Sequence, residues 1–208
     1  MARPITVTDE EIFAATVRAV GRVGPSRLTL ADVANEVGLS PAGLVKRFGS
    51  KRELLLAFVR RAPEAVDECF ARMRAAHASP LRALIGAATS VADHVQSAEE
   101  LANSLAFLQM DLSDPDFHRP ALANSQRILA GYEALLRDAV ADGELAKCHT
   151  RRVARALHAV TGGSMINWAI HRVGSASSFV RRDVETFVGL LRPGSQPATS
   201  RRRRRART

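Results

Sequence analysis

Apolar residues recur every three or four positions along most of this chain, which is the spacing of one face of an α-helix. Runs that alternate apolar and polar residues, joined by Asn-Gly or Asp-Gly turns, are absent, so strands are not predicted. The expected fold class is all-α with about nine helices. Their approximate bounds are 9–23, 29–37, 41–48, 51–76, 80–96, 99–111, 115–141, 150–173 and 178–192.

Polar residues predict where several of these helices begin. Thr8 with Glu11, and Ser50 with Glu53, have the spacing of a capping box, in which each residue bonds the backbone of the other. The expected capping residues are Thr8, Ser40, Ser50, Ser79, Thr150 and either Ser177 or Ser178. Gly24-Pro25 is expected to end the first helix, and Pro63 marks a kink or a boundary further on.

Residues 28–48 predict two short helices joined by a tight turn. The first has an apolar face of Ala31, Val33, Ala34 and Val37, and the second has Leu44, Val45 and Phe48. Gly38 permits the positive φ of a sharp turn, and Ser40 can cap the second helix. Two helices that cross steeply through such a turn form a helix-turn-helix, whose second helix enters the major groove of DNA. The sequence therefore predicts binding to duplex DNA.

The order of elements around this motif resembles the N-terminal domain of the TetR family of one-component transcriptional regulators. The matching residues are Ile12, Ala15, Gly24, Leu28-Thr29-Leu30, Asp32-Val33-Ala34, Gly38-Leu39-Ser40, Leu44, Phe48 and Ser50-Lys51. They cover roughly positions 8–60, over which spacing, caps and apolar positions agree together. The family usually has a tyrosine after the Leu44 position, whose hydroxyl touches a DNA phosphate. Val45 cannot make that bond, and Lys46 and Arg47 are the candidates to offset the loss.

The resemblance implies which side chains contact DNA. They are Thr29, Ser40, Pro41, Ala42, Gly43, Lys46, Arg47 and Lys51, while Leu44 and Phe48 pack inward. Lys46, Arg47 and the Ser40 hydroxyl are possible donors to bases or phosphates, and Pro41 and Ala42 suit thymine methyl groups. Thr29 and Lys51 stand at helix starts, where free N–H groups favour a phosphate. The alternative for the three cations is a solvated basic face.

Positive charge is concentrated at the two ends of the chain. The net charge is +9 over 208 residues. Positions 1–60 hold nine basic and six acidic residues, positions 61–200 hold fifteen of each, and positions 201–208 hold six arginines. The bias suits a polyanionic partner of the N-terminal domain and the tail. The neutral central segment is expected to serve another purpose.

These patterns divide the chain into three parts. A helix-turn-helix domain is expected at 1–60, with the motif at about 29–48, and a helical effector-binding and dimerisation domain at 61–192. The tail, 193–208, cannot bury apolar surface and is expected to be disordered. It is either an arm that touches the DNA backbone or a solvated tail without a partner.

A small-molecule effector of unknown identity is expected in the second domain, because the resemblance implies one. The candidate contacts are Phe107, Met110, Asp111, His158, Met165 and Trp168. A pocket in a helical bundle is mostly apolar with a few placed polar groups, although each residue could instead be ordinary core or surface. No His-x3-His or Cys/His cluster predicts a metal, and no cofactor is expected.

The last two helices are expected to form a homodimer interface, again as the resemblance implies. Gly162-Gly163 lies inside a strong helical pattern, where each glycine costs roughly 1 kcal/mol, so a close partner helix or a kink should offset it. The apolar face of the last helix comprises Phe179, Val180, Val184, Phe187, Val188 and Leu191. The competing use for that face is the core of the domain.

The remaining features limit the class of protein. No nucleophile, phosphate-binding or metalloprotease motif predicts an enzyme, and no apolar run approaches the roughly 20 residues that span a bilayer. The N-terminus has no secretory pattern, and Cys69 and Cys148 are expected to be reduced thiols. Together with these limits, the resemblance implies a cytoplasmic homodimeric repressor that binds a pseudo-palindromic operator. The rival is an architectural DNA-binding protein without a ligand.

Overall fold

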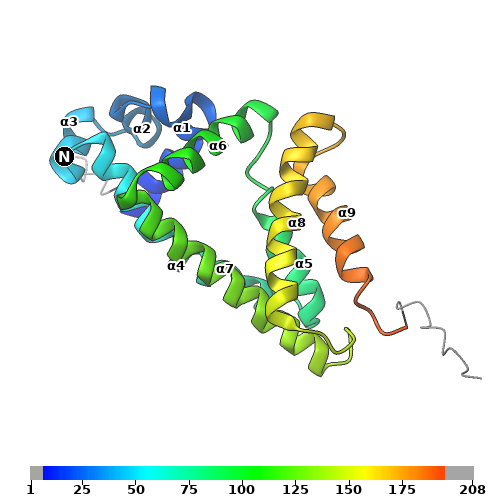
Figure 1. Ribbon diagram of the computed structural model, residues 1–208. Helices are drawn as coiled ribbons and strands as arrows, with labels where there is room; N and C mark the ends of the chain where they lie inside the picture. Colours follow the sequence, from blue (N-terminus) through cyan, green and yellow to red (C-terminus); the bar gives the residue numbers. More distant parts are fainter. Residues whose placement is uncertain (1–6, 195–208) are drawn as a thin grey trace, which may run out of the picture.

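The computed structural model describes residues 7–194, and this part of the chain contains nine α-helices and no strand (Figure 1). The helices are α1 (Asp9–Arg27), α2 (Leu30–Val37), α3 (Pro41–Phe48), α4 (Lys51–Ala76), α5 (Pro80–Ser90), α6 (Ala98–Ser113), α7 (Pro115–Ala141), α8 (Thr150–His171) and α9 (Ala176–Gly189). The predicted all-α class is confirmed. The expected tail lies, from residue 195 onward, outside the described residues.

The capping signals at the first and fourth helices differ in outcome. At α1 the whole box forms, since the Thr8 N–H donates to Glu11 Oε2 at 2.7 Å and the Glu11 N–H donates to Thr8 Oγ1 at 3.2 Å. At α4 the Ser50 hydroxyl accepts from the Glu53 N–H at 3.2 Å, but the Glu53 side chain makes no return bond to Ser50. Pro63 neither ends nor divides α4, which is one helix of 26 residues.

One predicted helix end and two predicted N-terminal capping residues are wrong. The helix expected over 80–96 ends at Ser90, where the hydroxyls of Thr89 and Ser90 donate to carbonyls one turn earlier and compete with the helix for them. Thr150 is the first residue of α8 and does not cap it. The cap of α9 is Ser175, which accepts from the Ser178 N–H at 3.2 Å, and neither Ser177 nor Ser178 takes that role.

The first helix breaks where the sequence predicts, at Gly24, and continues as a short turn to Arg27. Gly24 has a φ of 76°, which suits glycine alone without strain. A Cβ at this position would lie 2.8 Å from the Asn103 side chain on α6, and Asn103 donates to the Gly21 carbonyl at 2.7 Å. The break in α1 is therefore also the place where α6 packs against it.

Two apolar cores hold the molecule together. One is formed by α5, α7, α8 and α9, together with side chains of α4. The other contains the buried residues of α1 to α4, but it also includes Phe107 of α6 and Phe117 of α7. Phe58, Phe107 and Phe117 form a row of edge-to-face contacts with ring centroids 6.2 and 6.0 Å apart. The helix-turn-helix region therefore shares its core with the rest of the chain.

The hairpin of α6 and α7 contains a partly buried carboxyl group, that of Asp111. Its Oδ1 atom is inaccessible to solvent and has no hydrogen-bond partner. Burial raises the pKa of Asp111 to about 6, and the nearby charge of His118 opposes this effect. Ionisation of Asp111 is thus less favourable in the folded chain than in the unfolded chain.

The shared core predicts that Phe117→Ala destabilises the whole molecule. Phe117 is 0% exposed, so truncation should lower the free energy of unfolding by about 3 kcal/mol or more. Urea unfolding followed by circular dichroism should still show one transition. Leu112→Ala, at a residue 72% exposed, is the control and should cost less than about 0.5 kcal/mol. Unfolding of the N-terminal helices as a separate transition in the parent chain would contradict the shared core.

The environment of Asp111 predicts a pH-dependent loss of stability. Because its folded pKa of about 6 exceeds the unfolded value of 3.8, the unfolded chain loses the proton first, so stability falls as the pH rises between these values. We expect Asp111→Asn to be more stable than the parent by about 1 kcal/mol near pH 7, an amount reduced for partial exposure. Urea titrations should show the difference vanish below about pH 3.8. An equal difference at every pH would contradict the buried-carboxylate explanation.

Candidate nucleic-acid interface

The first helix of the motif, α2, begins with a complete capping box. Thr29 Oγ1 accepts from the Asp32 N–H at 3.2 Å, and both donors of Thr29 point to Asp32 Oδ2, at 2.6 Å from the hydroxyl and 2.8 Å from the backbone N–H. These bonds hold the pKa of Asp32 below its usual value. The Thr29 donors are thus already used, and a phosphate at this helix start would meet the next N–H groups of α2.

The turn and the start of α3 form as the sequence predicts. Gly38 has a φ of 67° and ends α2 in the left-handed conformation. The Ser40 hydroxyl accepts from the Gly43 N–H at 3.1 Å, and Pro41 stands at the first helical position, where no N–H is needed. The proton of the Ser40 hydroxyl remains available to an outside acceptor.

The second helix, α3, exposes most of its surface. Leu44 is its one fully buried residue, and Phe48 is half-buried against the core of the N-terminal helices. The exposed residues of α3 are Pro41, Ala42, Gly43, Val45, Lys46 and Arg47. Val45 is 48% exposed, so the position where the family usually has tyrosine does face outward. This narrow surface of small residues at the helix start leaves room for a base edge.

Arg47 does not extend freely from α3. Its guanidinium donates to the Val7 carbonyl at 2.6 Å and forms an ion pair with Asp9 at 2.5 Å. It also lies over the Phe48 ring, 5.9 Å from the centroid. Arg47 therefore fastens α3 to the start of α1 in this structure, and Lys46 is the cation of α3 that has no ion-pair partner among the described residues.

Lys51 also has an internal role. Its ammonium group lies 3.2 Å from both the Pro25 and the Ser26 carbonyl oxygens, at the end of α1. An ammonium has three donors, so one remains for a phosphate at the start of α4. Lys51 can thus hold α4 against α1 and contact DNA at the same time.

Two other cations of the N-terminal domain, Arg18 and Arg22, are paired. Arg18 and Arg22 bind the two oxygens of Glu36 at 2.7 and 2.6 Å. Burial acts to raise the pKa of Glu36, but the hydrogen bonds from Arg22 and Arg18 outweigh it, and the pKa is lowered. These pairs brace α1 against α2.

Arg52 links the N-terminal domain to the turn between α6 and α7. Its guanidinium contacts Asp114 at 2.6 Å and Asp116 at 2.8 Å, and it lies over the Phe117 ring at 5.2 Å. The hydrogen bond from Arg52 is the main reason that the pKa of Asp114 is lowered. Sequence reasoning missed this contact, because it joins residues that are 62 positions apart.

The six candidate effector contacts do not gather at one place. Phe107 and Met110 pack in the core shared with the N-terminal helices. Met165 and Trp168 are buried in the other core, where the Trp168 ring N–H donates to the Gly174 carbonyl at 3.0 Å and so holds the turn before α9. Asp111 lies in the α6–α7 hairpin described above.

His158 lies beside a buried tyrosine in the C-terminal core. Its ring lies 6.4 Å from that of Tyr132, and burial lowers its pKa. Burial also raises the pKa of Tyr132 to about 12, an effect that the Thr161 side chain opposes. Nearby on α4 and α5, the Cys69 Sγ and Ser90 Oγ atoms are 3.4 Å apart. The sequence analysis did not include Tyr132 among the candidate effector contacts. The one signal for it in the sequence is that it is the single tyrosine of the chain.

Within residues 7–194, no helix combines the length and apolarity needed to cross a membrane. In the same range, no group of three or more His, Cys, Asp or Glu side chains is arranged to hold a metal ion. The candidate surfaces are thus the exposed side of α3 and the interior of the C-terminal helices.

Comparison with known proteins gives a consistent result. Residues 12–58 match the family described as bacterial regulatory proteins, tetR family, and residues 77–193 match the C-terminal domain of BetI-type transcriptional repressors. No curated protein sequence matches this chain significantly.

Solved structures share the fold at low identity. A TetR transcription regulator from Haloarcula marismortui is 21% identical, with a TM-score of 0.66 over 88% of this chain and 97% of that one. PfmR from Thermus thermophilus is 24% identical, with a TM-score of 0.59 over 88% and 97%. FadR from Bacillus subtilis, solved in complex with stearoyl-CoA, is 14% identical, with a TM-score of 0.65 over 87% and 98%. The family matches cover both the helix-turn-helix region and the helices after it, and the chain belongs to the TetR family of DNA-binding transcriptional regulators, with a C-terminal domain of repressor type.

Proposed function

We propose that this chain is a cytoplasmic repressor that binds a pseudo-palindromic DNA operator as a homodimer and leaves it when a small molecule binds the C-terminal domain. The observation that carries the proposal is the exposed side of α3, where Lys46 and the Ser40 hydroxyl stand beside small residues on a helix held by caps at both ends. Such a helix can enter the major groove. No catalytic role is assigned.

Base reading is assigned to the exposed side of α3. Lys46 can donate to guanine O6 or N7, the Ser40 hydroxyl can bond either a base or a phosphate, and Pro41 and Ala42 can contact thymine methyl groups. Gly43 allows the close approach of the backbone. Lys51 and the start of α2 after Thr29 are assigned to phosphates. For Arg47 to contact DNA, it must leave Asp9.

The response to a ligand is assigned to the space where α4 meets α5 and α7. Phe70 of α4 packs so closely on Gly131 of α7 that a Cβ added to Gly131 would overlap the Phe70 ring. Met73 of α4 packs closely on Gly86 of α5, where an added Cβ would lie 2.9 Å from the Met73 sulfur. A small molecule that enters beside Tyr132 would have to displace Phe70, and α4 carries that displacement toward Lys51. Such a molecule shifts the equilibrium only if it binds the displaced state more tightly.

The similar structures support an organic effector. FadR from Bacillus subtilis holds stearoyl-CoA, and another protein of this fold, KstR2 from Mycobacterium tuberculosis, is described as a ketosteroid transcriptional regulator. Both proteins are less than 20% identical to this chain. They therefore support the binding of an organic effector, but they do not indicate which compound this chain binds.

Dimerisation is assigned to the outer face of α8, next to α9. Ile166 and Ile170 are 45% and 71% exposed there, and Val173 is 60% exposed. Gly162 and Gly163 are exposed on the same helix, and a Cβ added at either would meet no other part of residues 7–194 within 4 Å, so no contact among these residues offsets their cost. A second α8 packed on this face would bury the isoleucines and approach closely at the glycines.

The valines of α9 serve the core instead. Val180, Val184 and Val188 are buried, while Phe179 and Phe187 are half-buried against the same cluster. The apolar face expected for the dimer is thus largely used within the chain. The exposed isoleucines of α8 provide the cleaner test of the interface.

The DNA-binding proposal predicts different results for two lysines. After selection of a preferred sequence from a random DNA pool, Lys46→Ala should weaken binding to that sequence by about tenfold and relax the choice of base at one position. Lys51→Ala should weaken binding to all sequences and lower the salt slope by about one unit. Fluorescence anisotropy at several salt concentrations measures both effects.

Arg151→Ala, which removes an exposed arginine of α8, is the matched control and should change neither quantity. Selection of no preferred sequence, together with equal affinity for all duplexes, would overturn the repressor proposal in favour of the architectural one. An unchanged salt slope for Lys51→Ala would remove Lys51 from the phosphate contacts.

The dimer proposal predicts that Ile170→Asp produces a monomer. A charge in an apolar interface costs several kcal/mol, and Ile170 is too exposed in the single chain for the change to unfold it. Analytical ultracentrifugation should show the monomer, circular dichroism should show intact helices, and operator affinity should fall at least a hundredfold. Leu112→Asp, at another strongly exposed apolar residue, should remain a dimer. If Ile170→Asp sediments as the parent does, the interface lies elsewhere.

A further inference from the structure

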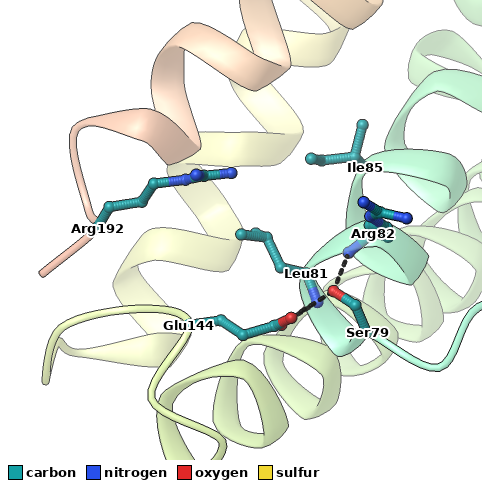
Figure 2. A pocket seen from close by; sticks show the side chains of 6 residues that line it. All are labelled: Ser79, Leu81, Arg82, Ile85, Glu144 and Arg192. Atoms are coloured by element: carbon teal, nitrogen blue, oxygen red, sulfur yellow. Dashed lines mark hydrogen bonds between the residues drawn. The ribbon is translucent and has the colours of Figure 1, made fainter.

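A cavity of about 380 Å³ lies at the end of the C-terminal domain that is formed by the start of α5, the turn after α7 and the end of α9 (Figure 2). Its lining residues are Ser79, Leu81, Arg82, Ile85, Glu144 and Arg192. It differs from the space beside Tyr132, because none of the residues placed there lines it. A volume of this size is in the range of small-molecule sites.

The walls of this cavity are fixed by bonds between distant segments. The Glu144 carboxylate accepts from the Leu81 N–H at 2.8 Å and from the Ser79 hydroxyl. The Ala146 N–H donates to the Leu191 carbonyl at 2.8 Å, which ties the turn after α7 to the end of α9. A cavity whose walls are already bonded to each other loses little entropy when it binds a ligand.

The charged groups of the cavity leave a net positive charge. Glu144 is committed to the start of α5, where its carboxylate satisfies free donors of the helix. Arg82 and Arg192 form no ion pair with any carboxylate of residues 7–194. Arg192 extends from the end of α9 toward α5 in Figure 2. The lining thus contains two guanidinium groups and a single carboxylate, which already has partners.

The floor of the cavity is apolar. Leu81 is 5% exposed and Ile85 is 8% exposed, and both belong to the core of the C-terminal domain. A ligand that fills the cavity would therefore contact the hydrocarbon of Leu81 and Ile85, with Arg82 of α5 and Arg192 beyond α9 as the cations of the lining. Burial of an alkyl group contributes about 0.8 kcal/mol for each CH₂, and a guanidinium recognises a carboxylate through paired N–H donors.

We propose that this cavity binds a small amphipathic carboxylate, whose anionic group lies between Arg82 and Arg192 and whose short alkyl part lies on Leu81 and Ile85. The site is separate from the effector space proposed above, and it does not depend on DNA binding. An effector in that space and a carboxylate here can be bound by the same chain.

Isothermal titration calorimetry of the full chain with octanoate tests the proposal. We expect saturable binding that Arg82→Ala and Arg192→Ala each weaken by about tenfold, because each removes one charge-assisted contact. Octanamide, with the same alkyl chain and no charge, and acetate, with the charge and no alkyl chain, should each bind at least tenfold more weakly than octanoate. Both arginines lie at the surface of the domain, so the variants should keep the thermal melting curve of the parent.

Arg119→Ala is the control for charge alone, since it removes an exposed arginine of α7 that does not line the cavity. It should leave octanoate binding unchanged. The proposal is overturned if the two cavity variants bind octanoate as the parent does, which would place the ligand elsewhere in the domain. It is also overturned if octanamide or acetate binds as tightly as octanoate.

Discussion

The row of rings in which Phe58 packs on Phe107, and Phe107 on Phe117, is the contact on which the arrangement of this molecule depends. The helices α2 and α3 have only eight residues each, and a unit of about sixty residues buries too little apolar surface to be more than marginally stable alone. Two aromatic rings from α6 and α7 complete their core. The direction in which α3 presents Lys46 is therefore set by residues that follow it in the sequence by about sixty positions or more.

The same junction offers a physical route between the two domains. α4 runs without a break from Lys51, beside the candidate DNA surface, to Met73 in the C-terminal core. Arg52, the second residue of α4, is held by Asp114 and Asp116 at the turn between α6 and α7. A shift of α4 must then be accompanied by movement of that turn or by loss of these ion pairs. Coupling between the domains requires only that the two arrangements differ in ligand affinity.

Local signals in the sequence were enough to predict the motif and the fold class. Gly38, Ser40 and the capping boxes act over three or four residues, so their spacing can be read directly. The internal engagement of Arg47 could not be predicted, because its partner Asp9 lies far away in the sequence. The prediction that the effector contacts share one site could not be tested from the sequence either. Phe107 and Trp168 are both residue types found in helical pockets, and only the tertiary packing shows that they lie in different cores.

The shared aromatic core also bears on modularity. A two-domain regulator suggests the construction of hybrids, in which the DNA-binding segment of one protein is joined to the ligand-binding segment of another. Here a junction near residue 60 would cut within α4 and would separate Phe58 from the Phe107 ring that packs on it. A functional hybrid must carry the matching surfaces of α6 and α7 with the N-terminal helices. In this chain the N-terminal helices and the C-terminal helices share one interface. Neither segment can be transferred to another protein unless that interface is transferred with it.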